Sequence, residues 1–181
     1  THFDGILGDI LNLFGDEELK KNTIVLFIGD HGEALMDHGI LGHSVNVYEE
    51  MIRYPMLVKF PDGESAAGRL VGQINHEAMT DLVTKIISGR VSAENFAEEA
   101  SKLSSEYLLS RNCNDTIQSV RYKSEWKFIK NADTGRDELY NLLKDPAEQN
   151  NVLEENAQIA MQLEEYLIEH QSELHNMSPH E

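Results

Sequence analysis

The sequence predicts a mixed α/β fold, in which a sheet flanked by helices is followed by a small antiparallel sheet packed on a long helix. The uncharged run Thr23–Ile28 is typical of a strand buried on both faces, as found in the middle of a parallel sheet. Apolar residues recur every three or four positions over 2–20 and 74–89, which predicts two amphipathic helices. Short strand-like segments follow one another beyond residue 106, and tight turns between them predict antiparallel pairing.

The first half of the chain carries clear signals for where its elements end. Gly15 is expected to end the first helix, which we expect to pack on the sheet. Pro55 leads into a second strand, 56–60, and Gly89 is a fitting stop for the helix over 74–89. Residues 92–106 are polar, acidic and compatible with an exposed helix.

The second half is expected to form the small sheet and the long helix. The helix is predicted at about residues 152–174, where apolar residues share one side. The sequence therefore predicts two parts, residues 1–105 and residues 106–181. The strands are predicted at residues 106–110, 116–122, 126–130 and 138–142.

Composition excludes some classes of partner. The chain has 181 residues, 40% of them hydrophobic, which is enough for one substantial core. Its net charge of −17 argues against nucleic acid and anionic membrane surfaces, because both require a basic surface. The single cysteine, Cys113, allows no disulfide within the chain. The first residue is Thr1 rather than Met, so we expect the chain to be part of a longer polypeptide.

An acidic residue and a histidine stand directly after the first predicted strand. Asp30 and His31 are followed by Gly32, and ligands in open α/β sheets bind at the carboxyl ends of strands. A carboxylate oxygen and a neutral imidazole nitrogen both bind divalent ions. The pair alone is more often a turn with an exposed histidine, so the metal interpretation depends on the residues around it.

Residues 30–61 strengthen the metal interpretation, because their whole pattern resembles the sulfatase family of the alkaline-phosphatase-like superfamily. Asp30-His31-Gly32 is followed by a loop, by Tyr48-Glu49 and by Arg53-Tyr54-Pro55, which leads into another strand. Further matches resemble the C-terminal strands and turn of that family; they are Trp126-Lys127-Phe128-Ile129, Glu138-Leu139-Tyr140-Asn141-Leu142 and Asp145-Pro146-Ala147-Glu148. The order and spacing of these pieces carry the resemblance, which implies the end of an alkaline-phosphatase-like mixed sheet.

The resemblance implies a role for several residues. Asp30 and His31 would bind a divalent metal, with Ca²⁺ expected for a sulfatase and Mg²⁺, Mn²⁺ or Zn²⁺ for a phosphohydrolase. A lysine that holds the sulfate usually occupies the position of His43, so His43 is expected to contact the anionic group of the substrate. A histidine carries full charge only below its pKa of about 6.5, which distinguishes it from lysine. His38 lies in the loop that shapes the substrate entrance, and we predict a second anion contact there.

Half of the expected site is missing from the sequence. The family also uses an early pair of acidic residues and a nucleophile, and neither has a match here. The segment Ser65–Arg69 superficially fits the nucleophile signature, but it follows the metal motif instead of preceding it. Ca²⁺ takes about six to eight oxygen ligands, so this chain alone is expected to bind metal weakly and to lack activity. The expected partners are the missing N-terminal half and an anionic ester, namely a sulfated sugar, an aryl sulfate or a phosphoester.

These residues leave three hypotheses about function. The first is the C-terminal part of a sulfatase that hydrolyses sulfate esters. The second is the same scaffold acting on phosphate or phosphonate esters or transferring a phospho-group, which His43 in place of lysine keeps open. The third is an interaction domain without catalysis, and the retained Asp30-His31-Gly32 counts against it. The resemblance favours a periplasmic or secreted location.

Overall fold

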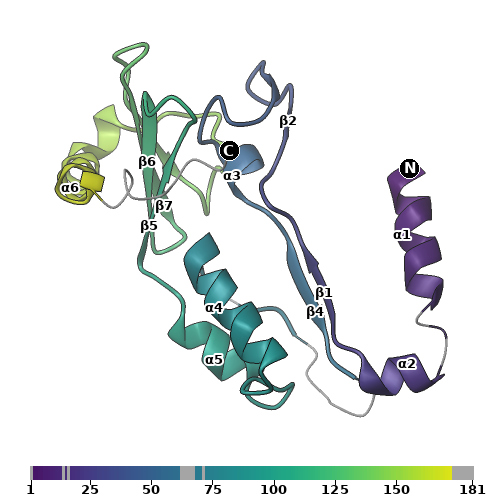
Figure 1. Cartoon of the computed structure of the whole chain (residues 1–181). Helices are drawn as coiled ribbons and strands as arrows, with labels where there is room; N and C mark the ends of the chain where they lie inside the picture. Colours follow the sequence, from purple (N-terminus) through teal and green to yellow (C-terminus); the bar gives the residue numbers. More distant parts are fainter. Residues whose placement is uncertain (1, 14, 16, 62–67, 71, 173–181) are drawn as a thin grey trace. The chain divides into compact units, whose positions relative to one another are not determined.

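The computed structural model describes residues 2–13, 15, 17–61, 68–70 and 72–172 (Figure 1). The chain divides into two compact units. The first comprises Thr1–Ile28, Pro55–Val71 and Glu77–Leu103, and the second comprises Gly29–Tyr54, Gly72–His76 and Ser104–Glu181. The loop after the first strand thus belongs with the C-terminal sheet. The division of the sequence into residues 1–105 and 106–181 stays a prediction.

The first unit begins with two helices, α1 (His2–Leu13) and α2 (Glu17–Asn22). Gly15 donates its N–H to the Asn12 carbonyl at 2.9 Å and ends the first helix as predicted, so the expected stretch 2–20 is broken there. The side chains of Ile6, Ile10 and Leu11 are exposed, and the predicted packing of this helix on the sheet is not found among the described residues. Among all of the described residues, no helix is long and apolar enough to cross a membrane.

The strand Thr23–Ile28 exists but pairs differently from the prediction. Strand β1 (Val25–Ile28) pairs antiparallel with β4 (Met56–Lys59), in a register that joins Val25 to Lys59 (Figure 1). The side chains of β1 are half-buried rather than buried on both faces. The expectation of a central parallel strand was therefore wrong in this chain, because an apolar run reports how much a strand is covered and not the direction of its neighbour.

A small core holds the rest of the first unit. Helix α4 (His76–Ile87) is followed by Gly89, which terminates it as predicted. Gly89 has a φ of +71° and donates its N–H to the Ile86 carbonyl. Helix α5 (Phe96–Lys102) falls inside the acidic segment 92–106. The buried apolar residues of this core come from α4, α5 and their connections; they are Phe60, Leu82, Ile86, Val91, Ala93 and Ala100.

The second unit contains the predicted antiparallel sheet. Its strands are β5 (Tyr107–Arg111), β6 (Ile117–Tyr122), β7 (Trp126–Asn131) and β8 (Glu138–Asn141), in that spatial order. A 3₁₀ turn, Glu154–Asn156, precedes helix α6 (Ala157–Glu169). The long helix predicted at 152–174 is thus confirmed in its middle, and residues after 172 lie outside the described part.

Alternating side chains give this sheet two different faces. Val120, Phe128 and Leu139 point to one face and form a core with Ala160, Leu163 and Leu167 of α6. Ile117, Ile129 and Tyr140 point to the other face and pack with Val47 and Leu142. The second face therefore holds the loop 29–54, which contains β2 (Ala34–Leu35), β3 (Leu41–Gly42) and α3 (Glu49–Ile52).

Candidate metal and anion site

Asp30 presents an exposed carboxylate two residues after β1. Its Oδ1 accepts the backbone N–H of His31 at 3.0 Å, and its main-chain carbonyl accepts a hydrogen bond from His76 Nε2 at 2.7 Å. The side chain is 90% exposed. The His31 N–H, with a smaller contribution from the His31 ring, lowers the pKa of Asp30 below its usual value. A fixed, ionised and exposed carboxylate is a suitable ligand for a hard cation.

His31 is oriented by its neighbour in the chain. Its Nδ1 donates to the Gly32 carbonyl at 2.7 Å, which leaves Nε2 with the lone pair. That Nε2 lies 3.8 Å from Asp30 Oδ2. Histidines that bind metals commonly donate their other ring N–H to a carbonyl or carboxylate in this way. The geometry therefore allows His31 Nε2 and Asp30 Oδ2 to face one ion.

Gly32 is needed because the backbone of α3 approaches it closely. Its N–H donates to the Met51 carbonyl at 2.8 Å. A Cβ built on Gly32 would lie 2.0 Å from the Glu50 carbonyl oxygen, which no side chain can tolerate. The glycine of the Asp-His-Gly motif thus lets α3 hold the start of the loop in place.

His43 lies beside His31. The two ring centroids are 4.5 Å apart. His43 Nδ1 is 2.9 Å from Glu33 Oε2, and both side chains are about half exposed. The pairing of Ala34 with Gly42 in the β2–β3 hairpin, extended by one residue, places Glu33 opposite His43. Because the Glu33 carboxylate accepts the Nδ1 proton, the Nε2 of His43 can donate to an anion only when the ring is an imidazolium.

His38 does not join that cluster. Its Nδ1 is 2.7 Å from Glu50 Oε1 and its Nε2 is 3.0 Å from the Glu148 carbonyl oxygen. Its ring stacks on Tyr48, with centroids 3.7 Å apart and an interplanar angle of 8°. Its predicted contact with the substrate stays a prediction, and this geometry favours a role in holding the loop.

A buried group of charges fixes the end of the loop to the sheet. Lys127 and Glu148 have fully buried side chains, and Lys127 Nζ lies 2.8 Å from Glu148 Oε1 and 3.3 Å from Glu49 Oε1. Glu148 Oε2 accepts the Glu49 N–H at 2.6 Å, and Arg121 lies 3.5 Å from the other Glu49 oxygen. Burial raises the pKa of Glu148, and Lys127 and the Glu49 N–H partly offset this. The motifs around Glu49, Lys127 and Glu148 therefore form one buried structural cluster.

Sequence reasoning did not single out Glu33 or His76 as parts of this site. His76 stacks on Tyr54, with ring centroids 4.5 Å apart, while it donates to the carbonyl of Asp30. Its position at the start of an amphipathic helix indicated only packing. Glu33 comes directly after the motif, but its partnership with His43 depends on the hairpin register. A local sequence pattern predicts neither the register of a hairpin nor a contact between residues 46 positions apart.

Metal-ligating groups are sparse among the described residues. Among them, no group of three or more His, Cys, Asp or Glu side chains is placed to hold a metal ion. The oxygen of Asp30 and the nitrogen of His31 nevertheless fit a divalent cation as two of its ligands. The assignment of Asp30 and His31 as half of a metal site stays a prediction.

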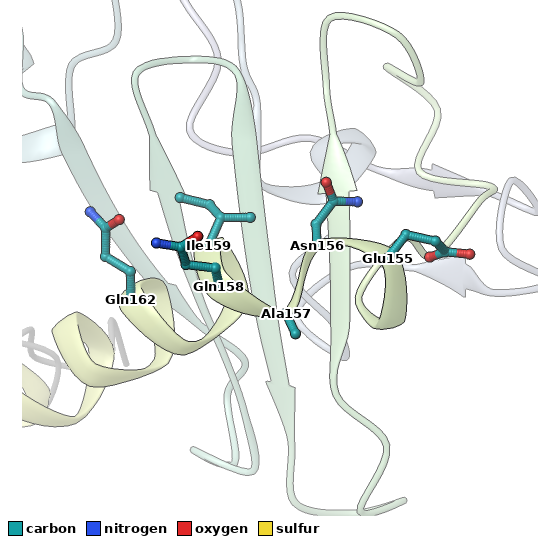
Figure 2. Close-up of a pocket in the computed structure, with 6 residues that line it drawn as sticks. All are labelled: Glu155, Asn156, Ala157, Gln158, Ile159 and Gln162. Atoms are coloured by element: carbon teal, nitrogen blue, oxygen red, sulfur yellow. The ribbon is translucent and has the colours of Figure 1, made fainter.

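A separate depression lies at the start of α6 and shares no residue with this cluster (Figure 2). Its volume is about 340 Å³, and amide side chains dominate its lining. It contains no histidine or basic group, so we assign it no chemistry. The lining residues are Glu155, Asn156, Ala157, Gln158, Ile159 and Gln162.

Comparison with known proteins identifies the family of this chain. The Sulfatase family model matches residues 1–105. The chain is 27% identical over 202 residues to an N-acetylgalactosamine-6-O-sulfatase of Bacteroides thetaiotaomicron, covering 91% of this chain and 39% of that protein. It is 25% identical over 182 residues to arylsulfatase K of Danio rerio, covering 91% of this chain and 34% of that protein.

Solved structures show the same mixed α/β fold. A structure from work on glycosaminoglycan metabolism by Bacteroides thetaiotaomicron matches with a TM-score of 0.68 at 21% identity, covering 94% of this chain and 43% of that chain. The chain thus spans roughly two fifths or less of the curated relatives named above, 39% and 34% of their lengths. Because the family model covers more than half of the residues and the predicted motif lies within the match, the chain belongs to the sulfatase family.

Proposed function

We propose that this chain is the C-terminal part of a metal-dependent hydrolase of sulfate esters. The observation that carries the proposal is the shared position of three groups: the exposed Asp30 carboxylate, the His31 Nε2 that lies 3.8 Å from it, and the His43 ring, whose centroid is 4.5 Å from that of His31. Asp30 and His31 can contact a cation at a point where His43 can contact an anionic ester. Membership of the sulfatase family supports the sulfate ester as the substrate class.

Each residue has a distinct part in this proposal. Asp30 and His31 would hold the divalent metal, for which Ca²⁺ is expected. When bound, the metal neutralises the charge of the ester and lowers the pKa of the attacking oxygen. His43 contacts the anionic group, and Glu33 fixes its ring through Nδ1. His38 is left out of the substrate contacts because both of its ring nitrogens are engaged.

The rest of the site is proposed to come from sequence outside this chain. Relatives are more than twice as long as the stretch that matches, which leaves room for the early acidic pair and the nucleophile. We further propose that β1 and β4 form part of a larger alkaline-phosphatase-like sheet that this additional sequence completes. The 181 residues alone would then bind metal weakly and show no turnover. A sulfated sugar or an aryl sulfate as substrate, and a location outside the cytoplasm, stay predictions.

The test compares two esters that share one leaving group. We expect the polypeptide encoded by the complete reading frame to release the alcohol from an aryl sulfate faster than from the matching aryl phosphate, and a chelator to stop both reactions. His43→Ala should lower kcat on the sulfate by about a hundredfold, the usual cost of one lost anion contact. His43→Lys should retain activity, and His170→Ala serves as the control.

Faster hydrolysis of the phosphate would favour the second hypothesis, a phosphoester hydrolase or transferase on the same scaffold. No hydrolysis of either ester by the complete polypeptide would favour an interaction domain. Unchanged kcat in His43→Ala would show that His43 does not contact the anion.

A further inference from the structure

His38 is the most constrained histidine of the loop that carries the proposed site. Its side chain is 13% exposed, and it is held on three sides by Glu50, by the backbone of Glu148 and by the ring of Tyr48. Glu148 is 110 residues away in the sequence, so this contact joins the loop to the turn after β8.

The two hydrogen-bond partners of His38 decide its protonation state. A carbonyl oxygen and a carboxylate oxygen both accept, and a neutral imidazole has a single N–H to donate. Both contacts, at 2.7 and 3.0 Å, are satisfied together by the imidazolium, which donates from both nitrogens. The stacked ring of Tyr48 offers the same cation a favourable π-face.

A neutral ring is the competing state. In it, His38 would donate from Nδ1 to Glu50 and accept at Nε2 from the side-chain amide of Gln149, whose nitrogen lies 3.3 Å away. That arrangement would set the Nε2 lone pair against the Glu148 carbonyl oxygen, which is closer at 3.0 Å. The shorter contact therefore favours the charged ring.

The surroundings of His38 are acidic. Burial opposes its charge, but the hydrogen bonds to the Glu148 carbonyl and to Glu50 outweigh burial and raise the pKa of His38 above its usual value. The carboxylates of Glu50 and Glu148 also act on it through their charges, and Asp145 is coupled to it in the same way. The hydroxyl of Tyr48 points away and donates to Glu138 at 2.8 Å.

We propose that His38, as an imidazolium, is a positioning residue that ties the middle of the site loop to the turn after β8 and so holds Asp30, His31 and His43 in place. The ends of this loop are held by other contacts, Gly32 to Met51 at 2.8 Å and Cys113 to Ser44 at 3.0 Å. The hairpin between them carries Glu33 and His43. The effect of His38 on catalysis rests on the proposed sulfatase function, whereas its effect on the loop does not.

The raised pKa determines the sign of the pH dependence. Folding stabilises the charged ring, so this stabilisation is complete below the unfolded pKa of about 6.5. It is lost as the pH rises through the higher folded value. The loop should therefore loosen on the alkaline side.

The first experiment is an NMR titration of the histidine side chains in the whole 181-residue chain, with His38 assigned by the signal missing in His38→Gln. We expect most of the His38 rings to show imidazolium shifts at both nitrogens at about pH 6.5, the ordinary pKa of histidine, and the titration to move to lower pH in Glu50→Gln. A neutral His38 at that pH, or a titration that Glu50→Gln leaves in place, would overturn the proposal. These readouts need neither activity nor a folded His38 variant, because the signal can also be assigned by its through-space contacts with the ring of Tyr48, whose centroid lies 3.7 Å away.

The second experiment measures amide hydrogen exchange at constant neutral pH. The amides of Met36 and Gly39, which are hydrogen-bonded within the hairpin, should exchange about tenfold faster or more in His38→Gln, consistent with loss of a hydrogen bond to a charged group. His170→Gln is the matched control, since His170 also stacks on a tyrosine, Tyr166, with centroids 3.9 Å apart. Equal exchange in wild type and His38→Gln would contradict the positioning role.

The third experiment separates this inference from the proposed function. In the complete polypeptide, kcat on an aryl sulfate should fall on the alkaline side, and Glu50→Gln should shift that fall to lower pH. An inactive wild type would overturn the sulfatase proposal, while the titration and exchange results would still decide the role of His38. If the wild type is active and Glu50→Gln does not shift the alkaline fall of kcat, the result counts against His38 as a positioning residue.

Discussion

Lys127→Ala is expected to lower the free energy of unfolding by about 3–5 kcal/mol, the usual cost of leaving buried charge without its partner. Lys127 and Glu148 have fully buried side chains 2.8 Å apart, and Glu49 shares the same ammonium group at 3.3 Å. Without the lysine, two buried carboxylates would face each other with Arg121 as the remaining cation, 3.5 Å from Glu49. Denaturant unfolding of the chain, followed by the fluorescence of Trp126, measures the loss.

The control for this variant is Lys130→Ala on the same strand. Lys130 pairs with Glu164, but both side chains are about one third exposed, at 35% and 36%. Exposed pairs contribute about 0–1 kcal/mol, so this variant should remain near wild type. Equal losses in the two variants would show that the buried cluster does not hold the loop to the sheet.

Gly32→Ala is expected to destabilise the chain by about 1–3 kcal/mol and to displace the Asp30–His31 pair. The new methyl group would sit 2.0 Å from the Glu50 carbonyl oxygen and 3.0 Å from that of Arg53. Both are backbone atoms of the α3 segment, so neither can turn aside as a side chain would. Denaturant unfolding measures the stability, and the NMR shifts of the His31 and His43 rings report the displacement.

Gly8→Ala makes the same chemical change where space is open. No atom lies within 4 Å of the built Cβ at this position in α1. Alanine is favoured over glycine within a helix by about 1 kcal/mol, so stability should hold or rise. A Gly32→Ala chain as stable as Gly8→Ala, with unshifted histidine rings, would contradict the close approach described for α3.

Local patterns predicted the elements whose neighbours are close in sequence. The strands β5 to β8 were found because each pairs with the next along the chain and alternates apolar with polar residues. Gly89 was found because its role depends on the helix just before it. The pairing of β1 was missed because β4, its partner, comes only after the whole loop.

The site shows the same division. His31 and His43 could be singled out because each belongs to a short motif in the sequence. The buried cluster could not, because Lys127 reaches Glu49 across 78 residues and Glu148 reaches it across 99. The substrate contact predicted for His38 rests on the family resemblance and stays a prediction, whereas its contact with the Glu148 carbonyl depends on the fold.

The most direct test of the central claim is sulfate release by the complete polypeptide carrying Asp30→Ala. Because the Asp30 side chain is exposed, its loss should leave the denaturant midpoint of unfolding close to that of the wild type. We predict that sulfate release from an aryl sulfate disappears and that added Ca²⁺ does not restore it, while Asp9→Ala in α1 keeps the wild-type rate. Turnover by Asp30→Ala equal to that of the wild type would contradict the assignment of Asp30 as a metal ligand, and with it the account of this site.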